Sequence, residues 1–195
     1  MTSTAQRTRR TSMTSLFLGV AVFTTGIVGA NTASTLIVAE ISGDGFSGVP
    51  NAASVLGTAV GALGGGVLMQ VRGTRWSLLL MYGIALAGAA LGFVGAANSL
   101  VLPLVLGNAM LGIGSGGAQL SRYAAAELYP PERQGFGLSV VVWAGTVGAI
   151  AGPALLAPAA AAAEGLDLTA LAGPMLAACV LVALAAAVSC GLPRL

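Results

Sequence analysis

Six long apolar blocks constrain this chain more than any other feature of its sequence. Each block is long enough for the roughly 20 residues that a helix needs to cross a bilayer, and the connectors between them are short and carry turn residues such as Gly43, Gly73 and Pro130. Backbone polar groups must bond internally in hydrocarbon, and no alternating barrel pattern is visible, so we expect helices. The predicted transmembrane segments are 14–39, 51–70, 76–97, 100–121, 135–160 and 168–192.

The composition excludes most soluble classes of protein. Charged residues make up 7% of the 195 residues, against about 25% in a typical soluble domain. Lipid is therefore the expected surrounding of an all-α membrane protein, with a short tail at 1–13 and a short end at 193–195. No nucleic-acid partner is expected.

Chemistry-bearing side chains are scarce. The chain has no histidine and no lysine, and its cysteines, Cys179 and Cys190, lie in an apolar stretch where they suit helix packing. We expect no metal, cofactor or disulfide framework. Ser115 lacks a histidine or lysine that could act as its base. We therefore predict that the chain is not an enzyme.

Arginine placement predicts the orientation in the membrane. With six spans, every arginine falls in the amino-terminal tail, the second connector, the fourth connector or the carboxyl end. The first and fifth connectors hold acidic residues instead, among them Glu40 and Glu164. The positive-inside rule then places both termini in the cytoplasm and the chain in the cell (inner or plasma) membrane. The apolar run after Arg10 is too long for a signal peptide, so we expect an uncleaved first helix.

Glycines recur four residues apart within the apolar blocks. This spacing lines up small residues on one helix face and lets two backbones approach closely. Ordinary packing explains such stripes, and sliding of helices during a transport cycle is the alternative. The series are Gly57, Gly61 and Gly65; Gly88 and Gly92; Gly112 and Gly116; and Gly148 and Gly152.

Three segments together resemble the major facilitator superfamily of transporters. Residues 66–75 resemble its signature loop G-x-L-x-D-R-x-G-R-R between the second and third helices, with matches at Gly66, Leu68, Gly73 and Arg75. Residues 122–133 resemble the end of the fourth helix and the loop after it. Residues 148–153 resemble the fifth-helix motif G-x-x-x-G-P, with Gly148, Gly152 and Pro153, which is typical of exporters.

The chain also departs from the family pattern. Gln70 stands at the acidic position of the signature loop, and Asn108 stands where the fourth helix of proton-linked antiporters has an arginine. Proton coupling of the standard kind is therefore not expected.

The resemblance implies half of a transporter fold. Six helices would form two inverted three-helix repeats, and a complete carrier has two such halves. The motif order implies the amino-terminal half. The other half could be missing from a fragment, be encoded separately or be replaced in a homodimer. We favour a fragment, because the chain stops where the family's central loop would begin.

The resemblance also implies where functional residues lie. The first and fourth helices line the central cavity in this family, and an amide is satisfied less easily by its own helix than a hydroxyl is. Trp143 could stack on a substrate. The cavity candidates are Asn31, Thr35, Asn108, Ser115, Gln119 and Trp143. A cytoplasmic charge cluster is predicted from Arg75, Arg122, Glu127 and Glu132.

These observations predict a secondary carrier, of the efflux type, that moves a small solute by alternating access. The alternative function is a non-transporting membrane assembly protein that uses its glycine faces to bind partner helices.

Overall fold

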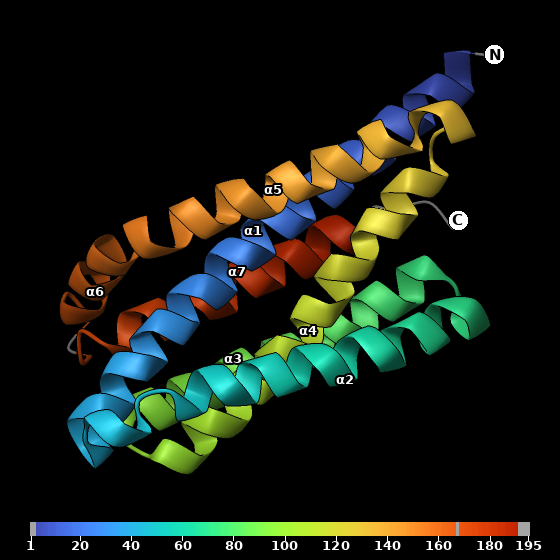
Figure 1. The fold of residues 1–195 in the computed structure, drawn as a ribbon. Helices are drawn as coiled ribbons and strands as arrows, with labels where there is room; N and C mark the ends of the chain where they lie inside the picture. The colour runs from blue at the N-terminus through green and yellow to red at the C-terminus, as the bar shows by residue number, and fades with distance from the viewer. Residues whose placement is uncertain (1–2, 167, 191–195) are drawn as a thin grey trace.

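The computed structural model describes residues 3–166 and 168–190 and is helical throughout, with no strand in that part of the chain. Six of its helical segments are long and apolar enough to cross a membrane. The fold is therefore an all-α bundle with the predicted number of spans (Figure 1). In chain order the helices are α1 (Ser3–Ser42), η1 (Asp44–Phe46), α2 (Val49–Arg72), α3 (Thr74–Ala97), α4 (Val101–Glu127), η2 (Pro131–Arg133), α5 (Gln134–Ala154), α6 (Leu156–Glu164) and α7 (Ala172–Cys190).

Proline marks where several of these helices begin. The first turn of a helix leaves its N–H groups without an intrahelical acceptor, so a proline there costs no hydrogen bond. Pro50, Pro103, Pro158 and Pro174 all lie in the first turns of their helices, α2, α4, α6 and α7. No proline interrupts α1, which continues from the predicted tail into the first span without a break.

The predicted fifth segment, 135–160, is two helices in the structure. Helix α5 ends at Ala154 and α6 begins at Leu156, and α6 turns away from the axis of α5 (Figure 1). Pro158 explains the position of the break, because it has no N–H for the carbonyl of Ala154 and its ring crowds that carbonyl. Pro153, the proline of the fifth-helix motif, lies instead inside the last turn of α5. The last helix begins at Ala172, later than the predicted residue 168, and residues 191–192 lie outside the described part.

The helices pack as two related groups of three. Helix α1 packs against α5 and α7, and α4 packs in the same way against α2 and α3. The two groups meet where α1 contacts α4 and where α3 contacts α7. Exchanging α1 with α4, α2 with α5 and α3 with α7 reproduces these contacts. The repeats in sequence are therefore α1, α2, α3 and α4, α5, α7. Because each repeat has three spans, the second repeat enters the membrane from the side opposite to the first. This is the expected pattern of two inverted three-helix repeats.

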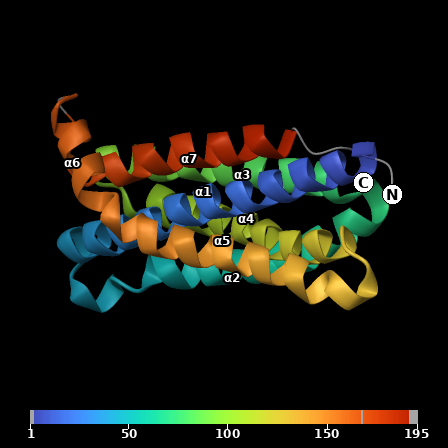
Figure 2. The same ribbon diagram turned by 90° about the horizontal axis from the view of Figure 1, so that it is seen from above.

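The repeats give the bundle two different faces. Helices α2 and α5 lie on one side, α3 and α7 lie on the other, and α1 and α4 run between them (Figure 2). In the spans of α2 and α5, 22% and 28% of residues are buried, against 44–56% in the other four. The face formed by α2 and α5 is therefore the less covered one.

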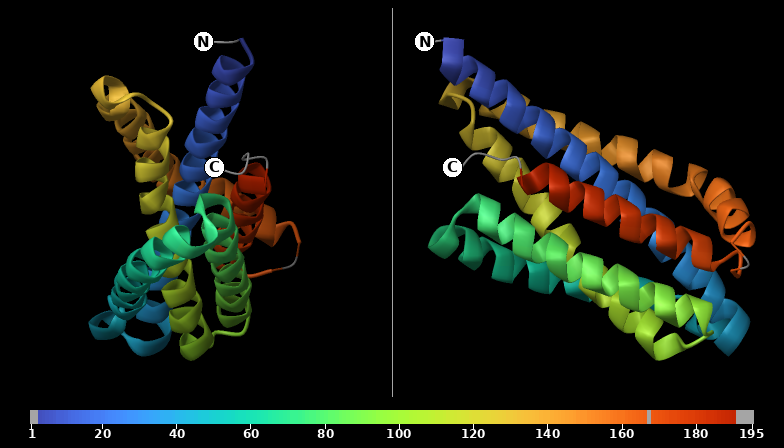
Figure 3. Two further views of the ribbon diagram at one scale, coloured as in Figure 1. Left: turned by 90° about the vertical axis from the view of Figure 1, so that its right-hand side faces the viewer. Right: turned by 180° about the vertical axis from the view of Figure 1, so that it is seen from behind.

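Charge separates along the bundle axis. The start of α1 and the end of α7 lie at one end, together with the α2–α3 and α4–α5 connections, and Figure 3 (left) views the bundle from that end. The segments that carry the described arginines all reach this end. Glu40, Asp44 and Glu164 lie in segments at the opposite end. The sequence asymmetry is thus an asymmetry between the two ends of the structure.

Glycine stripes set the closest helix contacts. A Cβ built on Gly57 or Gly61 of α2 would collide with the α4 backbone at Ala109 or Ile113. On the repeat-related pair, a Cβ on Gly148 of α5 would lie 2.5 Å from the carbonyl oxygen of Ala21 in α1. The glycine series of the sequence are therefore used inside the chain, at the equivalent contacts α2–α4 and α5–α1.

Candidate functional site

A polar cleft of about 390 Å³ opens between α1, α4 and α5. The α4 and α5 residues that line it each follow the spacing i, i+3, i+4, i+7, which places them on a single helix face. Two residues of α1, four positions apart, complete the wall. The lining residues are Val20 and Thr24 from α1, Ser115, Ala118, Gln119 and Arg122 from α4, and Val142, Gly145, Thr146 and Ala149 from α5.

Close packing of α5 on α1 positions this wall. Gly148 and Gly152, the two glycines of the fifth-helix motif, are buried against α1, where a Cβ on Gly152 would lie 2.8 Å from the Cβ of Val28. The α5 stripe next to them therefore faces across to α4. Gly145 has no atom within 4 Å of an added Cβ, so the backbone of α5 itself lines open space there. Pro153, the third motif residue, is exposed.

Two of the six predicted cavity residues lie on this cleft, Ser115 and Gln119. Asn31 and Thr35 line a separate open cleft of about 330 Å³ between α1 and the start of α2, together with Asn51. The Nδ2 of Asn31 donates to the Oγ of Ser54 across 3.4 Å. Thr35 donates to the carbonyl of Asn31 in its own helix.

Asn108 lies between α1 and α4 and lines neither of these two clefts, so its role as a cavity residue stays a prediction. Its side chain is completely buried, and Nδ2 donates to the Oγ of Ser34 in α1 at 2.7 Å and to the carbonyl of Leu104 at 2.8 Å. These bonds turn the amide into a link between α1 and α4. The Oδ1 of Asn108 has no hydrogen-bond partner among the described residues.

Trp143 lies beside the cleft lining and is not part of it. Its side chain is 67% exposed, one residue after Val142 on α5. With Phe136, Val147 and Ile150 it forms an exposed apolar stripe on α5. Such a stripe suits lipid or a partner helix better than a solute.

The signature loop is a tight connection between α2 and α3. Gly73 is the residue between them and has φ +81°, a conformation that side chains disfavour. Its N–H donates to the carbonyl of Met69, and Ser77 in the first turn of α3 donates back to the carbonyl of Gly65 at 3.2 Å. The positive φ explains why glycine suits this position, and the two bonds hold the connection in place.

The other signature residues differ in how much this chain covers them. Gln70 is exposed, Leu68 is half-buried, and a Cβ on Gly66 would meet open space. The motif side of α2 is therefore only partly packed within this chain.

The predicted charge cluster is only partly described. Arg75 is half-buried, and its Nε is buried with no hydrogen-bond partner among the described residues. Glu132 is exposed in η2, and the side chain of Glu127 lies outside the described part. Arg122 lies on the cleft, one helical turn after Gln119. The predicted pairing of Arg75 with either glutamate stays a prediction.

Sequence reasoning did not assign Arg122, Thr24 and Thr146 to one site. The signal was available in α4, where Ser115, Gln119 and Arg122 share a face by their spacing. The contributions of α1 and α5 depend on which helices pack together, and residue spacing within one helix does not show its partner helix.

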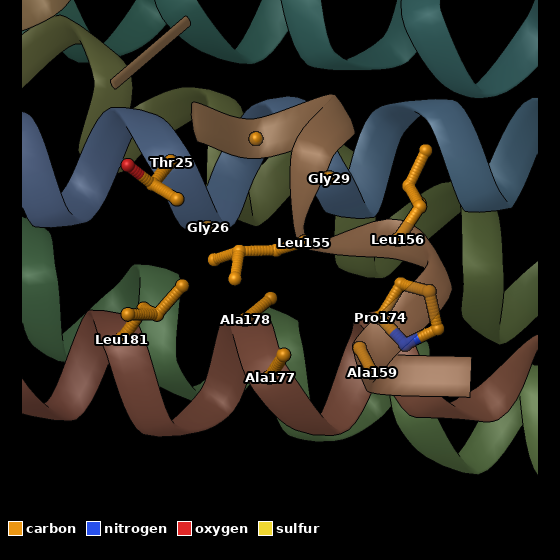
Figure 4. Close-up of a pocket in the computed structure, with 11 residues that line it drawn as sticks. Thr25, Gly26, Gly29, Leu155, Leu156, Ala159, Pro174, Ala177, Ala178 and Leu181 are labelled. Carbon is orange, nitrogen blue, oxygen red and sulfur yellow. The ribbon is translucent and has the colours of Figure 1, made fainter. Parts of the chain in front are cut away.

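A second hollow, at the α5–α6 break, is too small for a solute. It holds about 10 Å³, close to the minimum for one water molecule. Its wall is apolar except for Thr25, whose hydroxyl donates to the carbonyl of Ala21 (Figure 4). This hollow is best understood as imperfect packing where Pro158 forces α6 away.

Comparison with known proteins supports the resemblance seen in the motifs. No protein-family model matches the chain. The chain is 33% identical over 156 residues to YdeG, an uncharacterised MFS-type transporter of Bacillus subtilis strain 168. The match covers 78% of this chain and 36% of YdeG, so the chain spans little more than a third of that relative. The predicted resemblance to the major facilitator superfamily is therefore confirmed, for a chain with six transmembrane helices.

Proposed function

We propose that this chain is one half of a secondary transporter, the amino-terminal one, and that the α1–α4–α5 cleft is its share of the path for a small solute. The observation that carries the proposal is this cleft, half of whose ten lining residues are polar, within an apolar six-helix bundle, in a chain similar to an MFS-type transporter. Polar groups within a membrane span are costly and usually serve a pathway. Efflux by alternating access is part of the proposal.

A second half is part of this proposal. The face with α2 and α5 is the least buried part of the bundle, and the cleft is bounded only by α1, α4 and α5. A second six-helix unit, from the same or another chain, would cover this face and close the cleft. A homodimer and a purely lipid-covered face are the competing arrangements.

The glycine faces argue against the alternative function, a non-transporting assembly protein. That function needs glycine stripes that are open to partner helices. The stripes of α2 and α5 are instead occupied by α4 and α1.

Cysteine accessibility tests the pathway. In a background with Cys179→Ala and Cys190→Ala, we expect Gln119→Cys and Thr146→Cys to react with a membrane-impermeant methanethiosulfonate added at the arginine-rich end. Val180→Cys on α7 is the matched control, because its side chain is 54% exposed and lies outside this cleft. Lipid should keep it unreactive. Equal, low reactivity at all three positions would mean that the cleft is not an aqueous pathway.

Flux measurements test transport itself. Proteoliposomes with the chain and a second six-helix unit should move members of a labelled solute panel faster than protein-free liposomes. Gly145→Leu should abolish that flux, because a Cβ there meets no atom within 4 Å and the longer side chain would extend into the cleft. Absence of flux from the complete assembly would contradict the proposal.

A further inference from the structure

The cleft wall carries a positive charge and no negative one. Arg122 is the single ionisable residue among the ten that line it, and the polar remainder, Thr24, Ser115, Gln119 and Thr146, is neutral. Thr146 already donates to the carbonyl of Val142. Among the described residues, no hydrogen bond or ion pair occupies Arg122 or Gln119. The wall therefore offers one positive charge and an amide, with no carboxylate to compensate it.

The position of Arg122 makes that charge effective. It is half-buried near the end of the span Val101–Tyr123, where protein and lipid lower the effective dielectric constant. Coulomb attraction grows as the dielectric constant falls, and a cleft of one sign concentrates counter-ions. An anion in this cleft would supply a partner for Arg122 that none of the described side chains supplies.

The shape and the remaining lining narrow the class of anion. A guanidinium presents its N–H donors in a fork that matches a carboxylate, and the Gln119 amide one turn away adds a further donor. One arginine balances a single negative charge. Val20, Ala118, Val142 and Ala149 form an apolar wall, and about 390 Å³ accommodates a small organic molecule.

We propose that this cleft binds a small organic monoanion, a carboxylate with an apolar body, through Arg122 and Gln119. The inference rests on the proposed function, because it names the class of solute that the same cleft carries.

A charge series of similar size tests the inference directly. The full chain in nanodiscs of phosphatidylcholine is titrated with benzoate, benzamide and benzylammonium, and binding is measured by calorimetry. We expect benzoate to bind at least tenfold more tightly than benzamide, with benzylammonium weakest. Equal affinities for benzoate and benzamide, or no binding of benzoate, would overturn the anion proposal. Aqueous reactivity of Gln119→Cys would in that case leave the proposed pathway standing, so the two failures are distinguishable.

Variants assign the preference to Arg122. Arg122→Gln should remove the tenfold difference between benzoate and benzamide, and Arg122→Lys should keep part of it. Arg133→Gln is the control, because Arg133 is exposed in η2 and does not line the cleft. Gly145→Leu should block benzoate while leaving Arg122 in place. The same loss in Arg122→Gln and Arg133→Gln would indicate general attraction to this end of the bundle and would overturn the assignment.

Anionic lipid is the competing source of an anion. With phosphatidylglycerol in the nanodiscs, an unchanged preference for benzoate supports the proposal. Complete loss of benzoate binding would identify Arg122 as a site for lipid headgroups instead and overturn it.

Discussion

At the scale of single residues, the amide of Asn108 shows how a polar side chain is accommodated inside the bundle. Its bond to Ser34 joins α4 to α1 in a completely buried position, and a second bond goes to the carbonyl of Leu104 in its own helix. Cross-helix hydrogen bonds in membranes contribute about 0.6 kcal/mol on average. The link is therefore a modest one that fixes the relative position of two helices.

A double-mutant cycle measures this link. We expect Asn108→Ala, Ser34→Ala and the double variant to show a coupling free energy of about 0.6 kcal/mol in reversible unfolding from bicelles. Asn108→Ala alone should cost more, because it also leaves the Leu104 carbonyl without this donor and opens a small cavity. Strictly additive effects would show that the 2.7 Å contact between Asn108 and Ser34 does not stabilise the bundle.

Residue types alone indicated some of these roles. Thr25, Thr32, Ser34 and Thr35 all donate to the carbonyl four residues earlier in α1, as expected for hydroxyls in membrane helices. Amides reach other helices, so their partners depend on packing. The sequence could therefore single out Asn108 as unusual without showing that it faces inward and not onto the cleft.

At the scale of helices, glycine position decides which contacts are close. Gly61 and Gly64 lie three residues apart on α2, yet an added Cβ at Gly61 would lie 2.8 Å from the Cα of Ile113, while one at Gly64 meets nothing within 4 Å. The two positions form a matched pair in one helix.

Alanine at each position tests the contact. Gly61→Ala should destabilise the bundle by about 2 kcal/mol, because α2 must move away from α4. Gly64→Ala should be neutral or slightly stabilising, since alanine favours the helical backbone. The measurement is the free energy of unfolding of both variants in the same bicelles. Equal effects would mean that the α2–α4 distance is not set by this stripe.

The presence of six spanning helices was predictable from the sequence. The place where the fifth span is interrupted was predictable only in part. Apolar length is enough to place six spans, since lipid leaves the backbone few choices. Pro153 predicts a kink in the fifth span, and the helix breaks two residues later, at Leu155, where Pro158 removes the bond to the carbonyl of Ala154. The pairing of α2 with α4 and of α5 with α1 was not predicted, because small-residue spacing shows that a face packs closely but does not show against which helix.

At the scale of the whole molecule, the arrangement places the arginine-bearing segments at one end and three acidic residues at the other. An even number of spans returns the chain to the end where it began, which agrees with the start of α1 and the end of α7 lying at the same end. Because positive residues are retained in the cytoplasm, this end should be the cytoplasmic one.

Reporter fusions test the predicted orientation. Green fluorescent protein fused after Leu195 should fluoresce, because it folds in the cytoplasm, and alkaline phosphatase fused there should be inactive. Alkaline phosphatase fused after Glu164, at the opposite end, should be active because it reaches the oxidising side. The reverse pattern would invert the bundle and place Arg122 at the outer mouth of the cleft. The solute would then meet its guanidinium from outside, so the orientation decides from which side the proposed anion first binds.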